Sequence, residues 1–417
     1  MNIKKGEFVV VGGGISGIAA AVEIAEFGNK VTLIEKEASL GGRVSKMSLY
    51  FPKLCPPYCG LEIYFKRIRS NPNIQIMTLS EVANISGTPG NFTVTVRQSP
   101  RYVNAKCTGC NDCVSACPVE RPSDFDYSLS KTKAVYLPHE LSFPYRYVID
   151  DKTCPGAECG KCILACKYDA IDLGMKAESV ELKADAVIVA TGWKPYDAQK
   201  LTNLNYGKMS NLITNVMMER LAAPNGPTKG EILRPSDNKK VERVAFVQCA
   251  GSRDENHLPY CSAVCCTASL KQVSYVKEFN KEAQVSVFYI DLRVMGRNED
   301  FLTKIKQHDG LKFVKGKVAR ITEDPDTKDV WVEAEDILSG AKHRERFDMA
   351  VLATGIEPSL SGEKTCLGEQ DKYGFFGSGK DGIFHIGCCH TPSDVSACVK
   401  LANGAVLKAM QCVGGRA

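Results

Sequence analysis

The sequence predicts an α/β protein with parallel, doubly wound sheets and a cysteine-rich insertion. Residues 7–35 read in the order strand, glycine turn, helix, strand, which is the first half of such a sheet. Two later apolar runs, residues 186–192 and 349–355, each end in glycine, as strands do at the carboxyl edge of a parallel sheet. Residues 99–175 differ, because they are rich in Cys, Pro and Tyr and have little periodicity.

Length and composition exclude several classes of protein. The chain has 417 residues, which suggests two or three domains, and 44% hydrophobic with 24% charged residues indicates a globular protein. The net charge of +5 is mild and forms no basic block, so we expect no nucleic-acid partner. No stretch of 18 apolar residues occurs, so we expect no direct membrane span. The start resembles a secretory signal, but Glu7 and the spaced glycines favour a cytoplasmic chain.

The individual elements follow from periodicity. Residues 7–11 form an apolar strand, residues 18–27 have helical spacing closed by Gly28, and residues 31–34 form the next strand. A second strand–turn–helix unit begins at residues 244–247, and its second strand covers residues 285–290. A strand at residues 382–387 then precedes a helix over residues 395–410. We expect the following division: a first α/β domain in three parts, residues 1–98, 176–240 and 341–417; a cysteine-rich insertion, residues 99–175; and a second Rossmann-like domain, residues 241–340.

A glycine motif at the first turn predicts dinucleotide binding. Gly12, Gly14 and Gly17 have the G-x-G-x-x-G spacing, which permits a tight turn, close approach to a pyrophosphate and close helix–strand packing. The helix N-terminus would offer N–H groups to phosphate. Glu35 ends the second strand, where a carboxylate can bind ribose hydroxyls.

Further motifs favour FAD over NAD. Gly41, Gly42 and Arg43 follow Glu35 at a spacing typical of two-dinucleotide-binding flavoproteins, in which a late segment such as residues 387–394 contributes N–H groups to the flavin. The second unit's turn at residues 248–253 lacks the three glycines, so we expect no nicotinamide nucleotide, although a cryptic site stays open. The expected flavin-site residues are Gly12, Gly14, Ser16, Gly17, Glu35, Lys36, Gly42, Arg43, Val82, Thr191, Gly192, Gly387, Pro392, Ser393 and Asp394.

Two cysteine runs in the insertion predict iron–sulfur clusters. The first run has the C-x2-C-x2-C-x3-C-P spacing of bacterial ferredoxins, and the second has one longer gap. We expect two [4Fe–4S] clusters with crossed ligation, with zinc ribbons as the competing interpretation. The expected ligands are Cys107, Cys110, Cys113 and Cys166 for one cluster, and Cys154, Cys159, Cys162 and Cys117 for the other.

The remaining cysteines are less regular. Cys249, Cys261, Cys265 and Cys266 lie at the turn of the second unit, where a third cluster would face the flavin; the alternative is four buried, inert thiols. Cys55 and Cys59 could be a dithiol near the flavin, extra cluster ligands or part of a rigid turn. We expect packing roles for Cys366, Cys388, Cys389, Cys398 and Cys412.

These motifs together resemble the flavoprotein A subunits of heterodisulfide reductases, and more closely those of quinone-interacting membrane-bound oxidoreductase complexes. The resemblance rests on the glycine motif, the insertion, and residues 50–55, 190–196 and 248–254. It implies a thioredoxin-reductase-like scaffold with FAD and [4Fe–4S] clusters, and it matches the family's additional cluster to Cys249, Cys261, Cys265 and Cys266.

The resemblance also implies a function and partners. It implies electron transfer between a membrane quinone pool and adenylylsulfate (APS) reductase in dissimilatory sulfur metabolism. The expected partners are a haem-bearing membrane subunit, which would hold the chain at the membrane, together with a second flavin and iron–sulfur subunit. Electron relay requires no catalytic acid or base. The alternatives are a heterodisulfide-reductase-type subunit in another complex, a stand-alone NAD(P)H-dependent flavin disulfide reductase, or a scaffold subunit with a vestigial flavin.

Overall fold

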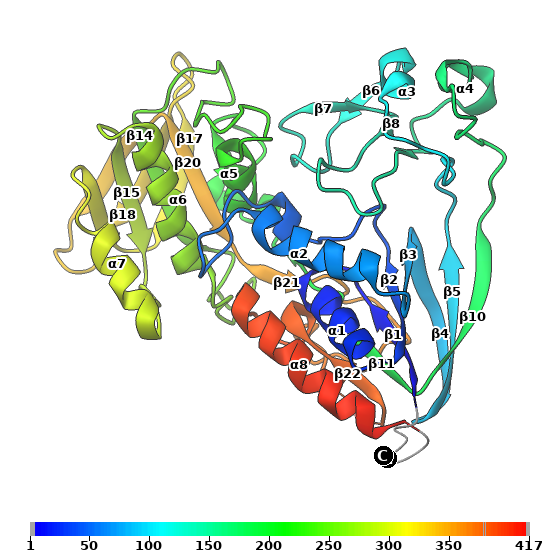
Figure 1. The fold of residues 1–417 in the computed structure, drawn as a ribbon. Coiled ribbons are helices and arrows are strands. Elements are labelled where there is room, and N and C mark those ends of the chain that lie inside the picture. The colour runs from blue at the N-terminus through cyan, green and yellow to red at the C-terminus, as the bar shows by residue number, and fades with distance from the viewer. Residues whose placement is uncertain (1–4, 378, 380, 414–417) are drawn as a thin grey trace.

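The computed structural model describes residues 5–377, 379 and 381–413. Two α/β lobes lie side by side, and a loosely structured insertion extends from the first lobe (Figure 1). No helix in the described part of the chain is long and apolar enough to cross a bilayer.

The first lobe is built on a five-stranded parallel sheet with the order β22-β11-β1-β2-β3. The two central strands, β1 (Glu7–Val11) and β11 (Ala186–Val189), are almost wholly buried, as parallel strands covered on both faces are. The sheet also contains β2 (Lys30–Glu35), β3 (Ile74–Thr78) and β22 (Ile383–His385). The strands predicted at residues 7–11 and 31–34 are therefore confirmed, with one residue added at each end of the second.

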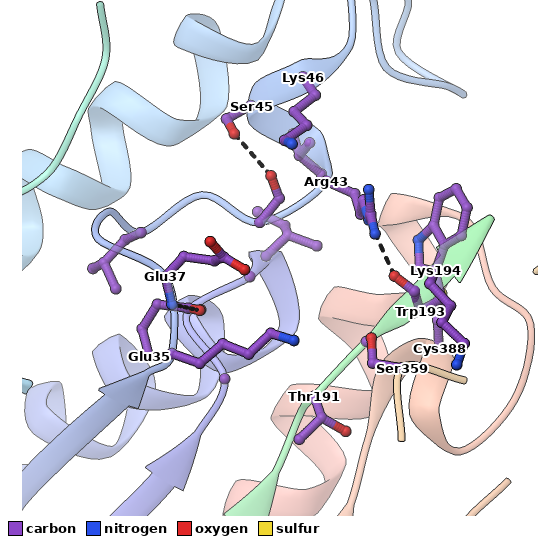
Figure 2. A pocket seen from close by; sticks show the side chains of 18 of the residues that line it. Glu35, Glu37, Arg43, Ser45, Lys46, Thr191, Trp193, Lys194, Ser359 and Cys388 are labelled. Atoms are coloured by element: carbon purple, nitrogen blue, oxygen red, sulfur yellow. Dashed lines mark hydrogen bonds between the residues drawn. The ribbon is translucent and has the colours of Figure 1, made fainter. Parts of the chain in front are cut away.

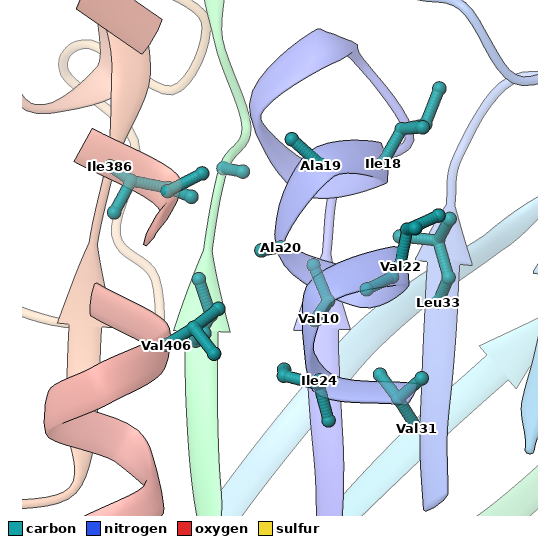
Figure 3. Close-up of a cluster of buried hydrophobic side chains, with 14 of the residues drawn as sticks. Val10, Ile18, Ala19, Ala20, Val22, Ile24, Val31, Leu33, Ile386 and Val406 are labelled. Atoms are coloured by element: carbon teal, nitrogen blue, oxygen red, sulfur yellow. The ribbon is translucent and has the colours of Figure 1, made fainter. Parts of the chain in front are cut away.

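Each face of this sheet has its own core. Phe8 and Val10 face the helices α1 (Ile15–Glu26) and α8 (Val395–Gln411), while Val9 and Val11 face an antiparallel sheet. Small residues on α1 let it approach α8, and Figure 3 shows Ala20 beside Val10 in this core. The same face is covered by α2 (Pro57–Ser70), and the antiparallel sheet has the order β10 (Glu178–Ala184), β5 (Asn91–Gln98), β4 (Ser80–Thr88).

Helix α1 begins three residues earlier than predicted. Gly17 lies inside its first turn, and a Cβ atom at Gly17 would stand 1.8 Å from the carbonyl oxygen of Gly12. The glycine therefore permits the close contact between helix and turn, so the helix includes part of the motif that the sequence suggested was turn.

The second lobe repeats the design. Its parallel sheet has the order β13 (Leu212–Thr214), β20 (Met349–Thr354), β14 (Arg243–Ala250), β15 (Gln284–Tyr289), β16 (Leu311–Lys315). One face carries α5 (Asn215–Ala222), α6 (Cys265–Phe279) and α7 (Glu299–Ile305), and the other carries the antiparallel strands β17 (Val318–Glu323), β18 (Val330–Glu335) and β19 (Lys342–Phe347). Strands β13 and β20 thus contribute to this sheet from outside the expected range 241–340.

Short elements link these parts. Strands β12 (Trp193–Pro195) and β21 (Ile356–Pro358) pair between the two lobes. The insertion contains the one-turn helices α3 (Asp112–Ala116) and α4 (Lys161–Ala165) and two small hairpins, β6 (Glu120–Pro122) with β7 (Lys131–Lys133) and β8 (Val135–Tyr136) with β9 (Val148–Ile149). Its small core includes the cysteines of both runs.

Candidate functional site

A cavity of about 810 Å³ lies where the first lobe, the second lobe and the insertion meet. Its walls come from the turn after β1, the segment after β2, the end of β11, the start of α6 and residues 121–139 of the insertion. Five segments far apart in the sequence therefore line one space that is large enough for a dinucleotide cofactor.

The start of helix α1 borders this cavity. Gly14 is the N-cap residue of α1 and has an extended backbone. No side chain caps this end of the helix, and its first turn contains no acidic residue. Such a helix N-terminus attracts phosphate through its free N–H groups and its dipole. Gly12 has a φ of +108°, and a Cβ there would stand 2.3 Å from the carbonyl oxygen of Ala190. Only glycine at this position therefore allows the turn to approach the end of β11 so closely.

Glu35 is held in place by the backbone around it. Its Oε2 accepts the Gly13 N–H at 2.6 Å and its Oε1 accepts the Glu37 N–H at 2.8 Å. The side chain is buried, and this burial raises the pKa of the carboxyl to about 7 despite the two hydrogen bonds. The carboxylate lies on the cavity wall in the position that binds ribose hydroxyls in dinucleotide folds.

Arg43 ties the opposite walls of the cavity together. Figure 2 shows its guanidinium reaching the backbone of Trp193, where Nε donates to the carbonyl oxygen at 3.1 Å. Its Nη1 donates to the hydroxyl of Tyr127 in the insertion at 3.1 Å. Lys46 lies 5.0 Å from the ring of the same Tyr127, and burial lowers the pKa of this lysine to about 8. Arg43 and Lys46 thus make this end of the cavity electropositive.

Most of the residues expected in the flavin site line the cavity. These are Gly12, Gly14, Ser16, Glu35, Lys36, Gly42, Arg43, Val82, Thr191, Gly192, Ser393 and Asp394. Gly17, Gly387 and Pro392 are not among its lining residues. Gly17 and Gly387 instead pack close to neighbouring residues. A Cβ at Gly17 would stand 1.8 Å from the Gly12 carbonyl oxygen, and a Cβ at Gly387 would stand 2.4 Å from the Ser16 hydroxyl.

Sequence reasoning missed the part of the wall that the insertion supplies. Phe125, Tyr136 and His139 line the cavity, and burial lowers the pKa of His139 to about 4. No local motif signals these contacts, because they depend on how the insertion folds back over the lobe. Trp193 had a signal, since it directly follows the predicted strand end at Thr191–Gly192.

The first run of cysteines places three thiols together, which we call the first thiol group: Cys107, Cys110 and Cys113. Burial, together with a smaller contribution from the neighbouring Cys107 and Cys110, raises the pKa of Cys113 to about 12. Cys113 is buried while Cys110 is exposed, so the group lies at the edge of the insertion's core.

The fourth cysteine of that run lies with the second run. Cys117 lines a small cavity together with Cys154, Cys159 and Cys162, which we call the second thiol group. Burial raises the pKa of Cys162, with further contributions from Cys154 and Cys117. This grouping is the one that crossed ligation requires of Cys117. Cys166 packs on the same core, where its Sγ accepts the Ala170 N–H at 3.4 Å.

A third thiol group, Cys249, Cys261, Cys265 and Cys266, lies between the end of β14 and the start of α6. The thiols of Cys265 and Cys266 are buried, and each has its pKa raised by burial and by the neighbouring thiols. Cys249 has a φ of +56°, a strained conformation that turns the chain at the strand end. Beside it the buried amide of Gln248 has no hydrogen-bond partner within the described chain. Four soft thiols gathered at one turn fit a cluster, which binds each thiolate at a separate iron.

The spacing of the cysteines in the thiol groups differs from the spacing that a single metal ion requires. Among the described residues, no three His, Cys, Asp or Glu side chains converge closely enough to hold one ion. A four-iron cluster binds each thiolate at a separate iron, so its ligands stand farther apart. The soft sulfur donors and the grouping in threes and fours therefore fit clusters.

Two further cysteine pairs stand outside these groups. Cys55 and Cys59 flank the start of α2, are partly and fully exposed respectively, and lie near the hydroxyl of Tyr50. Cys388 and Cys398 are buried together at the start of α8, in keeping with the packing role expected of them.

Comparisons with known proteins agree with this picture. The family of FAD dependent oxidoreductases matches residues 7–59. The chain is 37% identical over 416 residues to the iron–sulfur A subunit of the CoB–CoM heterodisulfide reductase of Methanocaldococcus jannaschii, covering 95% of this chain and 63% of that protein. It is 37% identical over 417 residues to an iron–sulfur A subunit of the same reductase from Methanopyrus kandleri, covering 96% of this chain and 63% of that protein.

Among solved structures, the thioredoxin reductase of T. acidophilum superposes with a TM-score of 0.54 at 15% identity and 98% coverage of both chains. That likeness defines the fold: an α/β scaffold of the thioredoxin-reductase type, used by an FAD-dependent oxidoreductase. Over nearly its whole length the chain is similar to the iron–sulfur A subunits of heterodisulfide reductases. It spans less than two thirds of the length of those relatives.

Proposed function

We propose that the chain is the FAD- and iron–sulfur-bearing electron-transfer subunit of a multi-subunit complex of the heterodisulfide reductase type. The observation that carries the proposal is a cavity of dinucleotide size whose walls come partly from two elements that also hold thiol groups, the insertion and the start of α6. Residues 121–139 of the insertion close the cavity from one side, and the start of α6, which holds Cys265 and Cys266, closes it from another.

The chain's own residues divide the work of binding. The N–H groups at the start of α1 would hold the pyrophosphate, and Glu35 would hold the ribose. Arg43 and Lys46 keep the opposite end positive, which favours a ligand that gains negative charge. The thiolates would hold [4Fe–4S] clusters, with Gln248 free to donate to a sulfur of the third. When bound, a flavin exchanges one or two electrons and a cluster exchanges one.

Reduction of the isolated chain tests this function against a stand-alone reductase. Anaerobically purified protein should be reduced by dithionite at both its flavin absorbance and its cluster absorbance, while NADPH should leave the flavin absorbance unchanged. Residues 248–253, at the end of β14 and just after it, lack the three glycines of a nucleotide-binding turn, which is the reason for the expected lack of response. Rapid flavin bleaching by NADPH would contradict the electron-transfer role and favour a disulfide reductase.

We also propose the finer assignment, namely electron transfer between a membrane quinone pool and cytoplasmic APS reductase. It is supported by the resemblance of residues 50–55 and 248–254 to the A subunit of quinone-interacting complexes. The relatives named above are heterodisulfide reductase subunits, and they support the coarser function better than this one.

Anaerobic co-purification from native membranes tests the finer assignment. We expect the chain to bring with it a haem-bearing membrane subunit together with a second flavin and iron–sulfur subunit, and we expect it to exchange electrons with APS reductase. Co-purification with heterodisulfide reductase subunits and no haem would contradict the quinone-linked role and leave the coarser one standing.

A further inference from the structure

Arg101 joins the flavin-binding lobe to the insertion. It lies just after β5, where the insertion begins, and it is only 8% exposed. Its Nη2 donates to the carbonyl oxygen of Ala38 and, at 2.8 Å, to the hydroxyl of Thr78, both in the first lobe. Its Nη1 donates to the carbonyl oxygens of Arg146 at 3.2 Å and Tyr147 at 3.4 Å, both in the insertion. One planar side chain therefore spans the boundary between two parts of the molecule.

The charge of Arg101 is not neutralised by these bonds. All four bonded acceptors are uncharged oxygens. Burial lowers the pKa of the guanidinium to about 10, so it remains a cation at neutral pH. Its electrostatic neighbours are Arg146, Tyr136 and Cys107. A buried cation without a bonded carboxylate is costly, and it stabilises any negative charge that is placed nearby.

The groups that Arg101 contacts on either side lie near the two places where a reduced cofactor would add negative charge, the cavity and the first thiol group. Ala38 lines the cavity of about 810 Å³. On the other side, the Tyr147 hydroxyl donates at 2.9 Å to Asn111, the N-cap of α3. Tyr147 and Cys113 belong to the small buried core of the insertion, and Cys107 packs against that core. Tyr147 therefore lies beside the first thiol group.

We propose that Arg101 is a positioning residue that fixes the first thiol group relative to the flavin cavity, and that its uncompensated charge favours the reduced state of the centre held there. The inference rests on the proposed function, because it assigns a cluster to Cys107, Cys110 and Cys113. Reduction adds one negative charge to such a centre, so a fixed cation close to Cys107 raises its reduction potential.

A redox titration of Arg101 variants, followed by electron paramagnetic resonance on anaerobically purified protein, tests the charge. The signal of the first cluster is assigned by its loss in Cys113→Ala. Arg101→Gln should shift the reduction equilibrium of that cluster about tenfold toward the oxidised state. This corresponds to a midpoint potential lower by about 59 mV for one electron. Arg101→Lys keeps the charge and should restore most of the potential.

Hydrogen–deuterium exchange tests the positioning. Lysine cannot donate to both lobes as the planar guanidinium does, so Arg101→Lys should speed backbone exchange at residues 38–40 and 146–149. Thr78→Val, which leaves Arg101 itself intact, should speed exchange at residues 38–40 without moving the potential. The matched control is Arg234→Gln, because Arg234 is equally buried but pairs with Asp329 in the second lobe. It should leave the first cluster's potential unchanged.

The outcomes separate this inference from the proposed function. An Arg101→Gln protein with full iron and flavin and an unchanged potential overturns the inference, as does a lysine variant shifted as far as the glutamine one. If the glutamine variant does not load its cofactors, unchanged exchange in Arg101→Lys and Thr78→Val overturns it. Wild-type protein without iron would instead defeat the proposed function.

Discussion

At the scale of single residues, Glu35 is the side chain with the most demanding environment in the flavin cavity. It accepts two backbone N–H groups, yet its burial outweighs them and raises its pKa from 4.5 to about 7. A carboxyl group whose folded pKa is raised stabilises the fold fully below its unfolded pKa, and this contribution is lost as pH rises through the folded value. The flavin-free protein should therefore lose stability between about pH 4.5 and pH 7 because of Glu35.

Replacing Glu35 with Gln should remove that pH dependence. We expect the wild-type free energy of unfolding to fall by up to about 3 kcal/mol relative to the variant over this window, since one pKa unit corresponds to about 1.4 kcal/mol. Chemical denaturation of the flavin-free proteins at pH 4.5 and pH 7.5 measures it. The same variant should bind FAD about tenfold more weakly, because the glutamine amide has one acceptor oxygen whereas the carboxylate has two. Parallel pH profiles for the two proteins would contradict the burial of a titrating carboxyl.

The sequence predicted the residues of the cavity that belong to short motifs. Glu35 and the glycines could be located because strand, turn and helix follow one another within residues 7–35. Lys46 and Arg101 could not, because the oxygens and rings that they contact belong to segments more than 20 residues away in the chain. A charged residue in a loop has no periodic pattern that distinguishes it from a solvated one.

At the scale of elements, two glycines of the segment that joins β1 to α1 have different roles, one in binding the cofactor and one in folding. A Cβ at Gly14 would have only the Gly42 Cα within 4 Å, at 3.9 Å, whereas a Cβ at Gly17 would stand 1.8 Å from the Gly12 carbonyl oxygen. Gly14→Ala should therefore keep nearly wild-type stability but lose FAD, because the methyl group enters the cavity. Gly17→Ala should lower the melting temperature of the flavin-free protein by several degrees. Thermal unfolding and flavin content of both variants measure this, and equal stability of the two would be the contrary result.

The insertion offers a second test at this scale. Because Cys117 lies with Cys154, Cys159 and Cys162, Cys117→Ala should remove the same paramagnetic signal as Cys162→Ala. It should spare the signal that Cys113→Ala removes. Iron content should fall by about four atoms in each case. Loss of the Cys113-dependent signal in Cys117→Ala would show that each run binds its own cluster.

The sequence predicted the ranges of strands and helices better than it predicted which strands pair in a sheet. Strands β1, β2 and β15 and helix α8 lie close to their predicted ranges, because apolar periodicity is a local signal. The membership of β13 and β20 in the second sheet is a matter of long-range pairing, which no local pattern encodes. Within each cysteine run the thiols gather because the chain between them is too short to separate them, whereas the grouping of Cys117 with the second run is a long-range contact.

At the scale of the whole molecule, buried ion pairs hold the three parts around the cavity. Arg220 in the second lobe is fully buried and pairs with Asp126 of the insertion at 2.8 Å. The same guanidinium lies 4.5 Å from the ring of Phe125, which lines the cavity. This pair anchors the insertion over the cavity.

Asp126→Ala should therefore destabilise the protein strongly. It leaves the Arg220 charge buried without its partner, which typically costs about 3–5 kcal/mol. The exposed pair of Lys30 with Glu7 is the control, since Glu7→Ala should cost less than about 1 kcal/mol. Urea unfolding of both variants compares them. A cost for Asp126→Ala no greater than that for Glu7→Ala would mean that the insertion is held by other contacts.

The central claim is that one chain holds a flavin in the cavity and iron–sulfur clusters on the thiol groups around it. The most direct measurement is the flavin, iron and acid-labile sulfide content of the protein purified without oxygen. The account predicts about one FAD and roughly 8–12 iron atoms per chain, with a similar amount of sulfide, from two or three four-iron clusters. Flavin without iron and sulfide, or zinc in place of iron, would contradict it.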